Sequence, residues 1–186
     1  MSQENMSKYG KHPAIWENTF IEVAGTLNPG SYFNISELIS GKDQHSTLVS
    51  TDGILIDHAF LKGKIVIIDF WYIRCQPCMR ELPGLHEIAK LYPDNDVVIL
   101  SLSRDDEESI QEYGLDTTDN VHMIPNIHPL VIDGADFRYP FKALVGPEGQ
   151  LIYSLLGAKK TNTPIATLVS DFSPKIDFLR QRYFMP

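Results

Sequence analysis

The chain has 186 residues, of which 43% are apolar and 22% charged, and its formal net charge is −8 at pH 7. This composition fits one globular domain with a single core, and the negative charge excludes a nucleic-acid surface built from clustered Lys and Arg. The first residues lack the apolar core of a signal peptide, and Asp69 stops the longest strongly apolar stretch, 65–68, so no segment is predicted to cross a bilayer.

The predicted elements begin with a weakly patterned lead-in. We assign residues 1–45 as an N-terminal extension packing on a domain formed by residues 46–186. Two β-rich runs, 46–50 and 54–57, flank the turn Thr51-Asp52-Gly53. Because Asp-Gly between two such runs favours a tight turn, this segment is predicted to be a β-hairpin.

The middle of the chain alternates strands and helices. The β-branched run 65–71 predicts a buried strand of a parallel or mixed sheet. A helix is predicted after Cys75 and ends near Pro93, which cannot continue it. Its apolar face consists of Leu82, Leu85, Ala89 and Tyr92. Residues 97–102 predict the next strand, and the acids of 105–108 open a short helix, which completes a βαβ unit.

The C-terminal third predicts a hairpin and a helix. Residues 141–145 and 150–153 flank Gly146-Pro147-Glu148-Gly149, a turn between two strands. The final helix is predicted from Pro174 to about Arg182, whereas residues 122–136 show no clear helical pattern. These elements together predict one α/β domain.

Cys75 and Cys78 carry the chemistry that the sequence suggests. They lie between the buried strand and the following helix, so Cys75 is predicted at a helix N-terminus, where free N–H groups and the helix dipole favour a thiolate. A hydrogen bond from the Cys78 thiol and the charge of Arg74 are expected to lower the pKa of Cys75 further. The two-residue gap lets the pair cycle between dithiol and disulfide. We assign Cys75 as the exposed nucleophile and Cys78 as the buried resolving thiol.

Residues 70–83 read Phe-Trp-Tyr-Ile-Arg-Cys-Gln-Pro-Cys-Met-Arg-Glu-Leu-Pro. This segment resembles the active-site segment of TlpA-like thioredoxins, the redoxin group of the AhpC/TSA superfamily. Residues 61–64 match the stretch that enters the central strand, and residues 139–152 are similar to the family's proline, strand and hairpin. The resemblance implies a thioredoxin fold, a central mixed β-sheet flanked by helices with an N-terminal β-hairpin extension. It also implies a thiol–disulfide oxidoreductase that exchanges Cys75–Cys78 with protein partners, acting as a reductant.

The same resemblance implies roles for residues around the cysteines. Asp69 matches a buried acid six residues before the first cysteine, with a raised pKa and a role as proton acceptor for Cys78. Pro140 matches a proline held cis beside the cysteines, and Pro83 a proline that kinks the helix. The predicted substrate-binding residues are Trp71, Arg74, Tyr139 and Pro140. Arg74 stands where most members of the family have Trp.

Other interpretations of the cysteine pair stay open. A zinc site would need two further ligands, for which His86, His122 and His128 are the candidates, and an inert disulfide would gain little from closing so short a loop. A thiol peroxidase of the peroxiredoxin type resembles Thr-x-x-Cys, whereas Tyr72 stands at that position here. A copper-carrying assembly factor would need His122 or His128 near Cys75.

The remaining expectations concern cofactors, partners and compartment. No metal or cofactor is predicted apart from the redox-active disulfide Cys75–Cys78. The predicted partners are thiol- or disulfide-bearing proteins and an upstream redox partner, with no nucleic acid and no membrane except through an N-terminal anchor outside this sequence. The chain is predicted to be a monomer. The resemblance implies an extracytoplasmic, periplasmic location, and a cytoplasmic one stays open.

Overall fold

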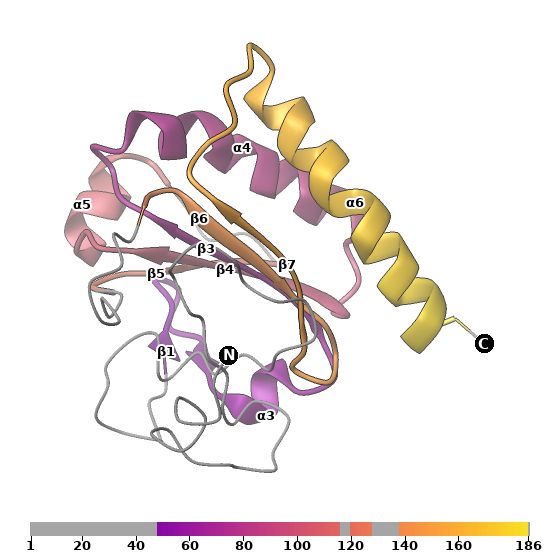
Figure 1. Ribbon diagram of the computed structural model, residues 1–186. Coiled ribbons are helices and arrows are strands. Elements are labelled where there is room, and N and C mark those ends of the chain that lie inside the picture. The colour runs from indigo at the N-terminus through magenta and orange to yellow at the C-terminus, as the bar shows by residue number, and fades with distance from the viewer. Residues whose placement is uncertain (1–47, 116–119, 128–137, 186) are drawn as a thin grey trace, which may run out of the picture.

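A mixed five-stranded sheet forms the centre of the molecule. The computed structural model describes residues 48–115, 120–127 and 138–185. The elements in chain order are β1 (Leu48–Val49), β2 (Leu55–Ile56), α3 (His58–Leu61), β3 (Ile65–Trp71), α4 (Gln76–Leu91), β4 (Val97–Ser103), α5 (Glu107–Glu112), β5 (Val121–Ile124), β6 (Phe141–Val145), β7 (Leu151–Leu156) and α6 (Pro164–Tyr183). Helices α4 and α6 cover one face of the sheet, and the β1–β2 hairpin and α3 lie on the other side (Figure 1).

Strand β3 lies at the centre of the sheet, whose strand order is β5-β4-β3-β6-β7. It pairs in parallel with β4 and antiparallel with β6, and all seven of its residues are buried. Burial on both faces explains why its sequence is a nearly continuous apolar run without polar alternation. The predicted mixed sheet with flanking helices is therefore confirmed, and so is the β1–β2 hairpin.

Two apolar clusters sandwich the sheet because successive side chains of a strand point to opposite faces. The hairpin-side cluster contains Val66 and Ile68 together with residues of the hairpin and α3. The helix-side cluster contains Ile65 and Ile67, the apolar faces of α4 and α6, and both cysteines. Each fully buried aliphatic side chain stabilises the fold by about 1.5–3 kcal/mol relative to exposure. By the same alternation Asp69 lies on the helix side.

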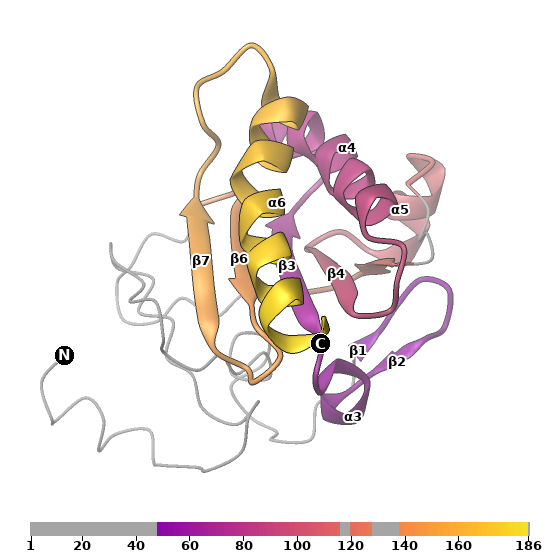
Figure 2. The same ribbon diagram turned by 90° about the vertical axis from the view of Figure 1, so that its right-hand side faces the viewer.

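Helix α4 begins directly after Cys75, which is its N-cap residue, and has Pro77 in its first turn. It contains Pro83 in its interior, as predicted, and ends where the Tyr92 N–H bonds to carbonyls of the preceding turn. Figure 2 shows α4 and α6 side by side over the sheet. Gly84 permits this approach, because a Cβ atom there would lie 3.0 Å from Cδ2 of Leu168 on α6.

Helix α3 was not predicted, and two further elements differ from the prediction. Helix α6 begins at Pro164, ten residues before the predicted start, and Pro174 lies inside it. A proline inside a helix costs about 3 kcal/mol, but the buried positions of α6 continue across Pro174 at helical spacing and offset that cost. These positions are Leu168, Phe172, Ile176 and Leu179. Strand β5 was not predicted at all.

The predicted extension, residues 1–45, lies outside the described residues, and the division of the chain at residue 46 stays a prediction.

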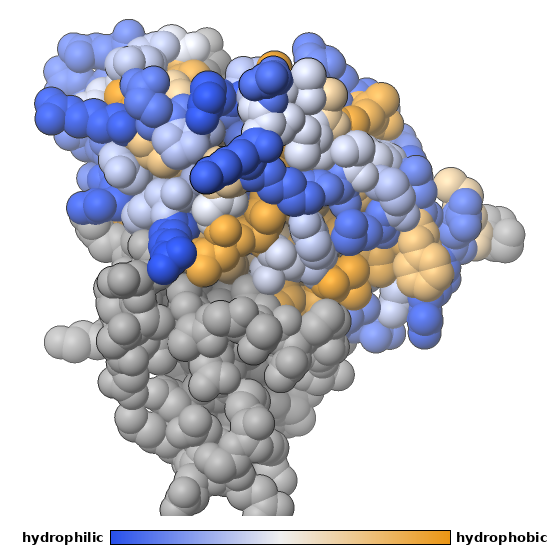
Figure 3. All heavy atoms as spheres, turned by 45° about the horizontal axis from the view of Figure 1, so that its top comes forward, coloured by the Kyte–Doolittle hydropathy of each residue, from blue (hydrophilic) through white to orange (hydrophobic). Residues whose placement is uncertain are grey.

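Within the described parts of the chain, no helix has the length and apolar character needed to span a membrane. Seen obliquely, the face that carries α4 and α6 is largely hydrophilic, with smaller separate hydrophobic patches (Figure 3).

Candidate active site

A disulfide joins Cys75 and Cys78 at the start of α4, with the two Cα atoms 5.2 Å apart. The Cys75 Sγ atom accepts a hydrogen bond from the Cys78 backbone N–H at 3.3 Å, so Cys75 caps the helix with its sulfur. Contrary to the prediction that Cys75 is exposed, both residues are buried in this disulfide form, at 4% and 2% exposure. Arg74 and Gln76 beside Cys75 are exposed, so the bond lies directly beneath the surface.

The loop between β3 and Cys75 is fixed by the end of the neighbouring strand. The Ile73 N–H donates to Oδ2 of Asp105 at 2.6 Å, and the Ser103 hydroxyl donates to the same oxygen at 3.0 Å. Parallel β3 and β4 end at the same edge of the sheet, which brings Asp105 beside the loop. The backbone that precedes the cysteines is therefore held in place by a hydrogen bond to a charged carboxylate.

Three buried charged side chains form what we term the buried charge cluster: Asp69, Glu81 and Lys142. The Lys142 Nζ atom donates to Glu81 Oε2 at 2.7 Å and lies 3.1 Å from Asp69 Oδ1, where it makes an ion pair. Lys142 is the direct antiparallel partner of Asp69, on β6 and β3, and Glu81 reaches the pair from α4. The cluster lies on the helix side of the sheet, the side that also holds the cysteines.

Burial and the charges of the neighbours together determine the protonation of this cluster. It raises the pKa of Asp69 above the ordinary value of 3.8; the charge of Lys142 opposes this rise and the charge of Glu81 adds to it. Burial alone would lower the pKa of Lys142, but the two carboxylates outweigh it, and that pKa is raised. Lys142 is thus a cation between two acids. The predicted burial of Asp69 and the direction of its pKa shift are confirmed, while its role as proton acceptor stays a prediction.

Glu81 and Lys142 were not among the predicted site residues, although each left a signal in the sequence. Lys142 interrupts the apolar run 141–145, and a lysine inside a buried strand needs an acidic partner. Glu81 falls at helical spacing with Leu85 and Ile88, on the buried face of α4. Their meeting with Asp69 depends on the pairing of β3 with β6, which no local pattern reveals.

The predicted substrate residues Tyr139 and Pro140 meet two residues that the prediction did not include. The Tyr139–Pro140 bond is cis, as predicted. The Tyr139 ring packs edge-on against Tyr72 at 5.0 Å between centroids, and the guanidinium of Arg104 lies 5.6 Å from the Tyr72 centroid and 5.9 Å from that of Tyr139. Burial raises the pKa of Tyr139 to about 12, so its phenol stays protonated in the physiological range.

Trp71 and Arg74 lie in very different surroundings. Trp71 is fully buried in the helix-side cluster, which also contains both cysteines, and its predicted substrate contact stays a prediction. Arg74 is exposed directly before Cys75, where a partner can reach it.

His122 lies across the sheet from the cysteines. It sits on β5 and packs edge-on against Phe60 of α3 at 5.3 Å, on the hairpin side. It therefore cannot join Cys75 in a copper or zinc site, and His128 falls outside the described residues. Among residues 48–115, 120–127 and 138–185, no three His, Cys, Asp or Glu side chains are grouped so that they could hold a metal ion.

Several known proteins are similar in sequence to this chain. Residues 42–169, more than half of the chain, match the profile of the AhpC/TSA family. The chain is 31% identical over 119 residues to NHL repeat-containing protein 2 of Gallus gallus, covering 59% of this chain and 16% of that protein. It is 30% identical over 99 residues to the thiol-disulfide oxidoreductase ResA of Bacillus thuringiensis, covering 50% of this chain and 57% of ResA.

A solved structure gives the same fold. A secreted Mycobacterium tuberculosis disulfide oxidoreductase homologous to E. coli DsbE superposes with a TM-score of 0.51 at 19% identity, covering 70% of this chain and 96% of the other. The thioredoxin fold predicted from the sequence is thereby confirmed.

Proposed function

Because the chain belongs to the AhpC/TSA family, we propose that it is a thiol–disulfide oxidoreductase that exchanges Cys75–Cys78 between disulfide and dithiol with protein partners. One observation carries the proposal: the disulfide closes at the N-terminus of α4, on the face of the sheet that also holds the buried charge cluster. The helix dipole favours a Cys75 thiolate, and a buried acid is available for the second thiol.

The proposed reaction passes two electrons to a substrate disulfide. The Cys75 thiolate attacks one substrate sulfur, which forms a mixed disulfide and releases the other substrate sulfur as a thiolate that takes up a proton. Asp69 then accepts the proton of the Cys78 thiol. The Cys78 thiolate attacks Cys75 Sγ, the substrate leaves as its second thiolate, and the Cys75–Cys78 disulfide is restored. An upstream dithiol partner reduces it again by the same steps in reverse.

Residues around the pair have separate roles in this proposal. Asp69 is the proton acceptor, and Lys142 with Glu81 holds the charge around it. The half-buried Tyr139 forms part of the surface on which an extended substrate segment lies, and the buried Pro140 holds its backbone. The positive charge of Arg74 favours the thiolate of its neighbour, Cys75.

Single cysteine variants test the proposal. With a disulfide-bonded protein as substrate and dithiothreitol as the electron source, Cys75→Ser should lower the rate of exchange to that of dithiothreitol alone. Cys78→Ser, reduced beforehand and then freed of dithiothreitol, should accumulate a mixed disulfide with the substrate. In the reduced wild type, alkylation at neutral pH should label Cys75 before Cys78. A wild type that consumes hydrogen peroxide rapidly and leaves protein disulfides intact would instead identify a peroxidase.

We further propose that the dithiol works as a reductant and outside the cytoplasm, as the resemblance to TlpA-like proteins implies. Equilibration with glutathione measures the potential: a value near about −270 mV fits a reductant and one near about −120 mV an oxidant. Cell fractionation of the source organism tests the compartment. A chain recovered only from the cytoplasm would refute the location and leave the exchange reaction standing.

A further inference from the structure

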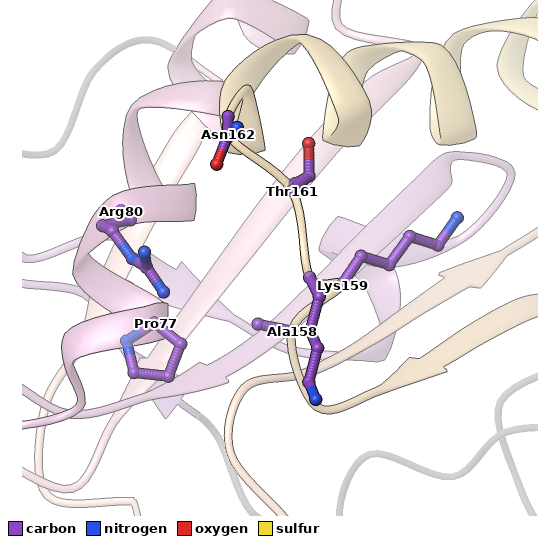
Figure 4. A pocket seen from close by; sticks show the side chains of 7 residues that line it. Pro77, Arg80, Ala158, Lys159, Thr161 and Asn162 are labelled. Atoms are coloured by element: carbon purple, nitrogen blue, oxygen red, sulfur yellow. The ribbon is translucent and has the colours of Figure 1, made fainter.

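An open pocket of about 750 Å³ lies against the N-terminal turns of α4, the helix that begins at the disulfide. Its walls are Pro77 and Arg80, in the first turns of α4, and the loop 158–162 between β7 and α6 (Figure 4). Pro77 stands between the two cysteines in the sequence, so a molecule that fills the pocket contacts the active-site segment itself. The volume falls in the range of about 300–1,000 Å³ that is typical of small-molecule sites.

The pocket is positively charged although the chain as a whole is acidic. Arg80 and Lys160 are exposed and form no ion pair with any residue that the structure describes. Lys159 also lines the pocket, but its Nζ atom is bound to Asp171 Oδ2 at 2.6 Å. None of the described residues that line the pocket is acidic. Two uncompensated cations therefore face the pocket in a chain of net charge −8.

We propose that this pocket binds a carboxylate of the thiol or disulfide compound that reacts with Cys75–Cys78, an inference that rests on the proposed function. The carboxylate belongs to a free small thiol or to an Asp or Glu beside the reactive cysteine of a protein, and both sources present the same chemistry. The guanidinium of Arg80 offers a planar set of donors that suits a carboxylate, and Lys160 adds a second charge. Binding there raises the local concentration of the anionic reactant at the disulfide.

The inference is tested on reduction of the disulfide by small thiols. One thiolate attacks a sulfur of the Cys75–Cys78 bond, giving a mixed disulfide, and the other cysteine leaves as a thiolate and takes a proton. A second thiolate attacks the external sulfur, which releases the small disulfide and leaves the protein dithiol. Two electrons pass from two thiols to the protein. The thiols are 3-mercaptopropionate, 2-mercaptoethanol and cysteamine, which are anionic, neutral and cationic, compared at equal thiolate concentration.

The test variant is Arg80→Glu/Lys160→Glu in the full chain. The control, Lys62→Glu/Arg182→Glu, makes the same change in net charge at exposed residues, one at the far end of β3 from the cysteines and one at the C-terminal end of α6. At low salt the test variant should be reduced by 3-mercaptopropionate at least about fivefold more slowly than the wild type. The rate with 2-mercaptoethanol should change less than about twofold, and the rate with cysteamine should rise. These differences should vanish in about 0.5 M salt, and the control should show none of them.

Cysteine peptides with flanking Glu or flanking Gln distinguish the two sources. In the test variant, the rate of disulfide reduction by each thiol is compared with the wild-type rate. A greater loss of rate with the Glu peptide than with 3-mercaptopropionate assigns the pocket to a protein segment, and an equal loss of rate assigns it to a small thiol. The inference is overturned if the test variant still reacts faster with 3-mercaptopropionate than with 2-mercaptoethanol to the same degree as the wild type. It is also overturned if the control variant loses as much of the 3-mercaptopropionate rate as the test variant does. If no thiol reduces the wild-type disulfide, the proposed function fails and the inference fails with it.

Discussion

Lys142 is the residue on which the buried charge cluster depends. Its replacement by Met leaves Asp69 and Glu81 close together and buried without a cation, and breaking such a pair costs about 3–5 kcal/mol. We expect Lys142→Met to lower the free energy of unfolding by about 3 kcal/mol near neutral pH. Urea denaturation gives the value, and Lys90→Met, which removes an exposed ion pair with Glu87, should change it by less than about 0.5 kcal/mol.

The pH dependence of the Lys142→Met defect has a definite sign. The pKa of Asp69 is already raised above 3.8 in the fold, and loss of the cation raises it further. The folded state then retains protons that the unfolded state has released, so stability falls as pH rises through this range. The loss relative to the wild type should be smaller near pH 5 than near pH 8. A loss that is equal at both values would show that the carboxylates do not interact with Lys142.

Asp69→Asn tests the proton transfer. The amide keeps the shape of the side chain and Lys142 keeps Glu81 as its partner, so the fold should persist. In the wild type the mixed disulfide should resolve faster as pH rises through the raised pKa of Asp69, because only the carboxylate accepts the Cys78 proton. Stopped-flow rates for the variant should be lower and should lack this rise. Identical pH profiles would make the carboxylate a bystander.

Some residues of the candidate site can be predicted from the local sequence, and others cannot. Cys75 and Cys78 are adjacent in a recognisable motif, and Asp69 stands at a fixed spacing before them. Arg104 and Lys142 reach the site from β4 and β6, so only the strand pairing brings them there. The full burial of Trp71 could not be predicted either, because a sequence position beside the cysteines says nothing about how closely other side chains pack around it.

At the scale of elements, the contact between α4 and α6 depends on the absence of a side chain at Gly84. A Cβ atom there would lie 3.0 Å from Leu168 Cδ2 and 3.4 Å from the Ile165 Cα atom, so the branched side chain in Gly84→Val would force the two helices apart. We expect a loss of about 1–3 kcal/mol in urea denaturation. Lys90→Val, on the exposed side of α4, should cost only about 0.5 kcal/mol. Equal losses in the two variants would exclude close packing at Gly84.

The sequence predicted two kinds of element correctly. One kind has a uniformly apolar interior, such as β3, and the other is bounded by residues typical of turns, such as the β6–β7 hairpin. Helix α6 was shortened because a proline suits the first turn of a helix, and both Pro164 and Pro174 qualified. Strand β5 spans only Val121–Ile124 and carries a histidine, so its position comes from pairing with β4 and not from its own pattern.

For the whole molecule, we predict that residues 46–186 fold without the preceding 45. Within the described residues, from 48 onward, an apolar cluster packs on each face of the sheet. A fragment starting at Ser46 should unfold cooperatively in urea and keep the exchange rate of the full chain with dithiothreitol. A fragment without a cooperative transition would show that the first 45 residues complete the core.

The hydrogen bond from Ile73 to Asp105 makes one backbone amide a reporter of the redox loop. An N–H that donates to a carboxylate at 2.6 Å should resonate far downfield in a proton NMR spectrum and exchange slowly with deuterium. Its chemical shift can be followed while the disulfide is reduced and re-formed. If the resonance keeps the same chemical shift throughout, the backbone before Cys75 does not move when the disulfide is reduced and re-formed. Differences in exchange rate between substrate proteins then arise from the substrate proteins themselves.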